Sequence, residues 1–197
     1  MSAATVTILE PEISWTPSTR GRLGMYCLIA AEAAIFTIFV VAYLFYLGKS
    51  LTGPTHEALH VPILFTICLL SSSVTIHLAV RFLKNGKSGA FTWWWFWTLA
   101  LGAAFLLGTA LEWRHLIYDE GLTLQTNLFG TTYYSLVGLH AFHVAMGLLG
   151  LSTVLVLTLL KKVKREHAER VDVLALYWHF VDSVWVVVFL VVYVIGR

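Results

Sequence analysis

The stretch "LYWHFVDSVWVVVFLVVYVIG", residues 176–196, decides the fold class. It belongs to an apolar run, residues 173–195, which has the length of roughly 20 residues that an α-helix needs to cross a hydrocarbon core of about 30 Å. Every backbone N–H and C=O must be satisfied inside lipid, and a helix does this within one segment. The run therefore predicts a transmembrane helix. Its His179 and Asp182 raise the question of what two ionisable side chains meet there.

Four other runs have the same character, and the composition agrees with them. Of 197 residues, 58% are hydrophobic and only 12% are charged, whereas soluble domains are about a quarter charged. We expect an all-α integral membrane bundle of five transmembrane helices, which forms a single domain over residues 23–197 after a tail of residues 1–22. The predicted spans are approximately 23–47, 61–83, 91–117, 131–160 and 173–195.

The distribution of Lys and Arg predicts the orientation of the bundle, since cytoplasmic loops carry an excess of these residues. One side would hold Lys49, Arg114 and Arg197. The other side would hold ten cations: Arg20, Arg22, Arg81, Lys84, Lys87, Lys161, Lys162, Lys164, Arg165 and Arg170. We expect a cytoplasmic N-terminus and an external C-terminus, with "FTWWWFW" (residues 91–97) as an aromatic belt at the cytoplasmic interface. The net charge of +2 gives no indication of nucleic-acid binding.

Ionisable side chains recur within the predicted spans, where they need partners or water. They are Glu32, His77, Glu112, His140, His143, His179 and Asp182. His179 and Asp182 are three residues apart and share a helix face, as do His140 and His143. We expect the face of His179 and Asp182 to point into the bundle, toward Glu112, His140 or His143.

Three interpretations of these polar residues compete. A metal site would use carboxylates and histidines from several helices, but no two of the predicted spans each carry the Glu-x-x-His motif that di-metal bundles have in pairs. A proton path would use Glu32, an acid within an apolar helix. A structural role would tie the helices together by polar contacts. The structural role has the strongest support, and we expect neither a bound metal nor a catalytic residue.

Four motifs resemble the cytochrome c oxidase subunit III family of the heme–copper oxidases. They are "RLGMYCLIAAEAAIF" (22–36), "VPILFTICLLSSSVTIHLA" (61–79), "GTTYYSLVGLHAFHV" (130–144) and "DVLALYWHFVDSVW" (172–185). The last two are specific, and the resemblance covers almost the whole membrane region. It is closest to the five-helix bacterial form, which lacks the first two helices of seven-helix members.

The resemblance implies an accessory, non-catalytic subunit of a proton-pumping terminal oxidase. Such a subunit binds no heme or copper itself, contacts subunit I directly, and belongs to a complex with subunit II and other members. It stabilises subunit I and supports proton uptake and oxygen access. Phospholipid is the candidate ligand, although the missing helices formed one wall of the family's lipid cleft. Glu32 corresponds to the family's intramembrane carboxylate. The motif residues expected to be structural are Glu112, His140, His143, Tyr177, Trp178, His179 and Asp182.

Alternatives remain open from the sequence. The electron donor of the complex could be cytochrome c or quinol, and a relative accompanies nitric oxide reduction. A rival of another class is a stand-alone proton channel or transporter built on Glu32. A transporter favours internal repeats and broken helices, and the sequence has no such repeat between its halves. The expected location is the inner (plasma) membrane of a bacterium.

Overall fold

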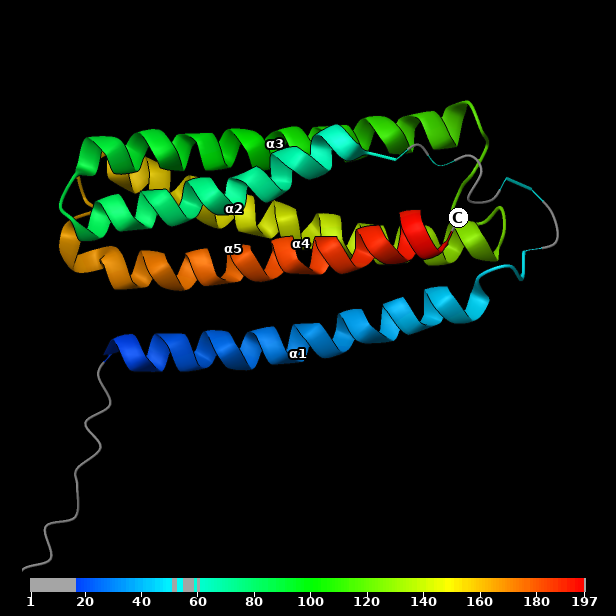
Figure 1. Cartoon of the computed structure of the whole chain (residues 1–197), viewed down its shortest axis with the longest axis horizontal. Helices are drawn as coiled ribbons and strands as arrows, with labels where there is room; N and C mark the ends of the chain where they lie inside the picture. The colour runs from blue at the N-terminus through cyan, green and yellow to red at the C-terminus, as the bar shows by residue number, and fades with distance from the viewer. Residues whose placement is uncertain (1–16, 51–52, 55–58, 60, 197) are drawn as a thin grey trace, which may run out of the picture.

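The computed structural model describes residues 17–50, 53–54, 59 and 61–196, and it is a bundle of five long helices (Figure 1). No strand occurs among these residues. The main helices are α1 (Pro17–Tyr46), α2 (Ile63–Lys84), α3 (Ser88–Tyr118), α4 (Leu128–Leu159) and α5 (Ala168–Phe189). A 3₁₀ turn, η2 (Arg165–His167), precedes α5, and a π-helix, η3 (Leu190–Ile195), continues it. All five are long and apolar enough to cross a membrane, which confirms the predicted fold class.

The helix boundaries differ from the predicted spans mainly at the N-terminus. α1 begins at Pro17, six residues before the apolar run starts at Leu23. Proline is compatible with the first turn of a helix because its missing N–H has no intrahelical acceptor there. The helix thus extends through Arg20 and Arg22, within the segment predicted as a tail.

The helices pack as one group of four with α1 laid along its side (Figure 1). α2 packs against α3 and α5, α4 packs against α3 and α5, and α1 contacts α4 and α5. Arg22 and Lys84 both reach Asp172, at 2.5 Å and 3.2 Å, so the starts of α1 and α5 and the end of α2 lie at one end of the bundle. This places three of the cation-rich segments on one side of the membrane.

Large aromatic side chains fill the centre of the bundle. The indole of Trp178 lies against Gly102 of α3 and Gly147 of α4, where an added Cβ would come within 2.8 Å of the ring at either position. The outer surface is apolar as well, which suits a lipid environment rather than water. The largest fully buried side chains include Trp95, Trp178, Trp185, Tyr43, Tyr133, Phe91 and Phe105.

The tryptophans of residues 91–97 do not form a uniform belt. Trp93 and Trp97 are exposed, as a membrane-interface position requires, but Trp95 is fully buried. Its indole N–H donates to the backbone carbonyl of Leu151 on α4 at 2.9 Å. The belt prediction was therefore wrong for Trp95, because this side chain lies on the face of α3 that packs against α4.

Candidate functional site

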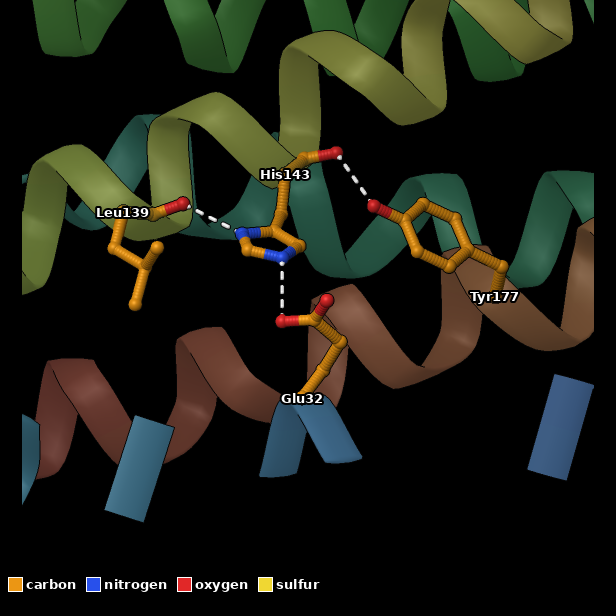
Figure 2. Close-up of polar contacts among 4 residues, drawn as sticks. All are labelled: Glu32, Leu139, His143 and Tyr177. Atoms are coloured by element: carbon orange, nitrogen blue, oxygen red, sulfur yellow. Dashed lines mark hydrogen bonds and ion pairs between the residues drawn. The ribbon is translucent and has the colours of Figure 1, made fainter. Parts of the chain in front are cut away.

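A carboxylate–imidazole pair joins α1 to α4 about midway along both helices. Figure 2 shows Nε2 of His143 facing the carboxylate of Glu32, with 3.1 Å between Nε2 and Oε2. The other ring nitrogen, Nδ1, lies 2.7 Å from the carbonyl oxygen of Leu139, one turn earlier on α4. Tyr177 of α5 donates its hydroxyl hydrogen to the carbonyl of His143 at 3.2 Å. Three helices thus meet around His143.

The contacts of His143 restrict where its protons lie. A carbonyl oxygen only accepts hydrogen bonds, so Nδ1 carries a hydrogen and donates it to Leu139. Nε2 then either accepts a proton from a Glu32 carboxylic acid or, as part of an imidazolium, donates to a carboxylate. The pair has no net charge in both arrangements, and they differ by the position of a single proton. A neutral unit is what a partly buried site in a membrane tolerates.

His140 lies one turn before His143 but has a different environment. Its imidazole is fully buried and stacks on Trp185, with 5.0 Å between ring centroids and 28° between planes. Phe105 and Phe36 approach its edges. Neither ring nitrogen has a hydrogen-bond partner among the described residues. His140 therefore acts as a packed ring between α3, α4 and α5.

The polar residues of α5 meet α2, not the residues predicted for them. Trp178 donates its indole hydrogen to Oγ of Ser72 at 2.8 Å. Oγ of Ser73 lies 3.0 Å from Nδ1 of His179, and the Ser73 hydroxyl also donates to Oδ2 of Asp182. The prediction that His179 and Asp182 point toward Glu112, His140 or His143 was wrong. The reason is tertiary: α2 lies against this face of α5.

A second carboxylate lies toward the end of the bundle that is opposite the Arg22–Asp172 ion pair. Tyr193 donates its hydroxyl hydrogen to Oε1 of Glu112 at 3.0 Å, and its oxygen lies 3.5 Å from the hydroxyl of Tyr133. Tyr193 belongs to the π-helix η3. π-Helical segments are rare and frequently accompany functional sites. Here the π-helical segment contains Tyr193, which contacts Glu112 of α3.

The described residues contain no group of three or more His, Cys, Asp or Glu side chains that could hold a metal ion. Five of the predicted polar residues lie at three separate sites: Glu32 contacts His143, Glu112 contacts Tyr193, and His179 and Asp182 both contact Ser73. At the first site, Tyr177 of α5 also bonds to the backbone of His143. Beside the third site, Trp178 of α5 bonds to Ser72 of α2.

The partners Ser72, Ser73 and Tyr193 were missed as site residues. "SSS" at residues 71–73 within an otherwise apolar span was a usable signal, because hydroxyls in membrane helices commonly bond to neighbouring helices. Nothing in the local sequence distinguishes Tyr193 from an interfacial aromatic residue.

Comparison with known proteins gives a consistent result over nearly the whole chain. The sequence profile of a family described as "Cytochrome c oxidase subunit III" matches residues 16–197. The chain is 36% identical to cytochrome c oxidase subunit 3 of Alkalihalophilus pseudofirmus over 190 residues, which are 95% of this chain and 92% of the relative. It is 35% identical to the protein of the same name from Bacillus subtilis, over 88% of this chain and 86% of the relative. A probable quinol oxidase subunit 3 of Staphylococcus saprophyticus is 28% identical, over 89% of each chain.

Proposed function

The chain belongs to the cytochrome c oxidase subunit III family, and from this we propose that it is the accessory, non-catalytic subunit III of a heme–copper terminal oxidase. The observation that carries the proposal is the extent of the match, which includes all five helices and each of the three polar sites. Membership in a multi-subunit oxidase complex of the membrane follows from the family.

The finer proposal is that this subunit lies directly against subunit I in a bacterial inner membrane, with a cytoplasmic N-terminus. The hemes and copper would then belong to partner subunits. The convergence of Arg22, Lys84 and Asp172 at one end supports the proposed orientation, since this is the end at which the cations gather. The apolar outer surface supports contact with phospholipid and with the partner's helices.

The proposed role of Glu32 is to support proton uptake and to keep the oxidase active through turnover. The Glu32–His143 pair supports this role because a one-proton rearrangement changes neither its net charge nor its partners. The other motif residues are proposed to be structural. Trp178, His179 and Asp182 hold α5 to α2, Tyr177 holds α5 to α4, and Glu112 holds α3 to η3.

A quinol oxidase is the second candidate, and it is supported by the similarity to the Staphylococcus saprophyticus protein. The donor site would lie in other subunits. Oxygen consumption by the purified complex, measured with reduced cytochrome c and separately with a quinol, would identify the electron donor.

Affinity purification of the tagged chain from its native membranes, in a mild detergent, tests the proposal. We expect co-purification of a heme- and copper-containing subunit I, with oxygen consumption by the complex. Recovery of the chain alone, with Glu32-dependent proton flux in liposomes, would instead establish the rival channel. Stoichiometric iron or copper in the chain freed of subunit I would show a metal-binding bundle.

A further inference from the structure

A polar groove runs into the bundle from the end where Arg22, Lys84 and Asp172 meet. It has a volume of about 250 Å³ and lies between α1, α2 and α5. Asp172, Arg22, His77 and His179 are among the residues that line it. At about 30 Å³ for each molecule, the groove has room for several waters. A lipid tail in this space would leave ionisable groups without hydrogen-bond partners, so water is the occupant that its lining favours.

The groove ends at a buried chain of hydrogen bonds. His179 lines the groove and is linked through Ser73 to Asp182, which is 3% exposed. Ser73 lies eleven residues before Lys84 on α2, or about 16 Å along the helix at 1.5 Å per residue. Asp182 is therefore near the middle of the membrane, and the Ser73 hydroxyl is its link to the groove.

The geometry supports transfer of one proton between His179 and Asp182. When the proton is on the imidazole, Nδ1–H donates to Oγ of Ser73 and the Ser73 hydroxyl donates to the Asp182 carboxylate. Transfer moves the Nδ1 proton to Oγ while the hydroxyl proton passes to Oδ2. An imidazolium and a carboxylate thereby become a neutral imidazole and a carboxylic acid. The imidazolium forms beforehand, when a hydronium ion in the groove gives its proton to Nε2 and becomes water, so that one proton is taken up and charge and atoms balance.

The chain of hydrogen bonds stops at Asp182 within the part of the bundle that the structure describes. Its Oδ1 is buried and has no hydrogen-bond partner among the described residues. A proton that reaches Asp182 therefore leaves by the way it entered. We infer that His179, Ser73 and Asp182 form a proton-storage site that exchanges with water on the Lys84 side through this groove.

The surrounding charges belong to three helices. α1 contributes Arg22 and Tyr26 to the groove, α2 contributes His77, and α5 contributes Asp172, with which Lys84 of α2 is paired. The Glu32–His143 pair is bonded to other partners and takes no part in this chain. The storage site is thus distinct from the proposed role of Glu32, and it does not depend on which electron donor the oxidase uses.

Cysteine accessibility in the intact complex tests whether the groove holds water. Cys27 and Cys68 are free and are first replaced by Ala. We expect His77→Cys to react with a charged methanethiosulfonate from the Lys84 side at least about tenfold faster than Val74→Cys, because a charged reagent is excluded from hydrocarbon. Val74 is the matched control, since it is exposed on the same helix but does not line the groove. Equal rates at the two positions would overturn the inference.

Infrared spectroscopy of the complex tests the exchange itself. We expect a carboxylic acid C=O band that Asp182→Asn removes and that shifts in D₂O. Ser73→Ala should slow this shift at least about tenfold because the bridging hydroxyl is lost, and Ser73→Thr should restore it. An unchanged rate in Ser73→Ala, or no band that depends on Asp182, would overturn the inference. Because both readouts follow this site alone, they remain informative if the complex proves not to be an oxidase.

Discussion

Nε2 of His143 lies 3.1 Å from Oε2 of Glu32, and this contact joins α4 to the least buried of the five helices. Another polar contact between α1 and the bundle is the ion pair of Arg22 with Asp172. Interhelical hydrogen bonds in membranes contribute on average under about 1 kcal/mol, so the Glu32–His143 pair fixes the register of α1 more than it holds the helix in place. The same contact carries a proton that can lie on either partner.

Changes at Glu32 should separate hydrogen bonding from proton exchange. We expect Glu32→Ala to assemble nearly normally, since the lost bond contributes only about 1 kcal/mol or less, but to take up protons more slowly or lose activity sooner during turnover. Glu32→Gln keeps a donor for Nε2 and should restore thermal stability without restoring proton uptake. Thermal denaturation and single-turnover proton uptake measure the two effects. Glu169→Gln, at an exposed position near the start of α5, is the control. Wild-type uptake and working life in Glu32→Ala would remove the proposed role.

A methyl group at Gly102 should destabilise the bundle. The new Cβ would lie 2.8 Å from the Trp178 ring, which cannot withdraw without losing its bond to Ser72. Overpacking of this kind typically costs about 1–3 kcal/mol. Gly89→Ala, also on α3, meets no atom within 4 Å and should be neutral or mildly stabilising. The thermal midpoints of the two variants in detergent provide the comparison. Equal midpoints would show that the ring and Gly102 are not in contact.

Loss of the Tyr193 hydroxyl should weaken the junction between α3 and η3. Tyr193→Phe removes the donor to Glu112 and leaves the carboxylate without this bond, at a cost of about 1–3 kcal/mol. Tyr118→Phe, at a side chain that is 80% exposed, should cost nothing measurable. Chemical denaturation of the purified complex gives both values. If the two variants unfold alike, Glu112 has another donor.

Leu substitutions on the α2-facing side of α5 should affect assembly more than chemistry. Asp182→Leu or His179→Leu removes a partner of Ser73, so we expect less of this subunit per heme in the purified complex. The rate of oxygen reduction per heme should change little. Ser183→Leu is the matched control, because Ser183 is exposed and donates to the carbonyl of His179 on its own helix. Full retention of the mutant subunit together with loss of oxygen reduction would contradict a structural role.

The fold class and the candidate residues were predictable from the sequence. Five apolar runs of membrane-spanning length leave helices as the only arrangement that satisfies the backbone, and each run proved to be a helix. Glu32, His143 and Asp182 stood out because ionisable groups are rare at membrane depth. The resemblance to the cytochrome c oxidase subunit III family was confirmed by the family match over residues 16–197.

The pairing of these residues was decided by the tertiary structure alone. Helical spacing places His179 and Asp182 on one face but does not determine which helix covers that face, and both met Ser73 instead of the predicted groups. Likewise, His140 and His143 are three residues apart, yet one is enclosed by aromatic rings and the other bonds to Glu32. The physical reason is that periodicity fixes directions within one helix, whereas partners depend on the packing of helices distant in sequence.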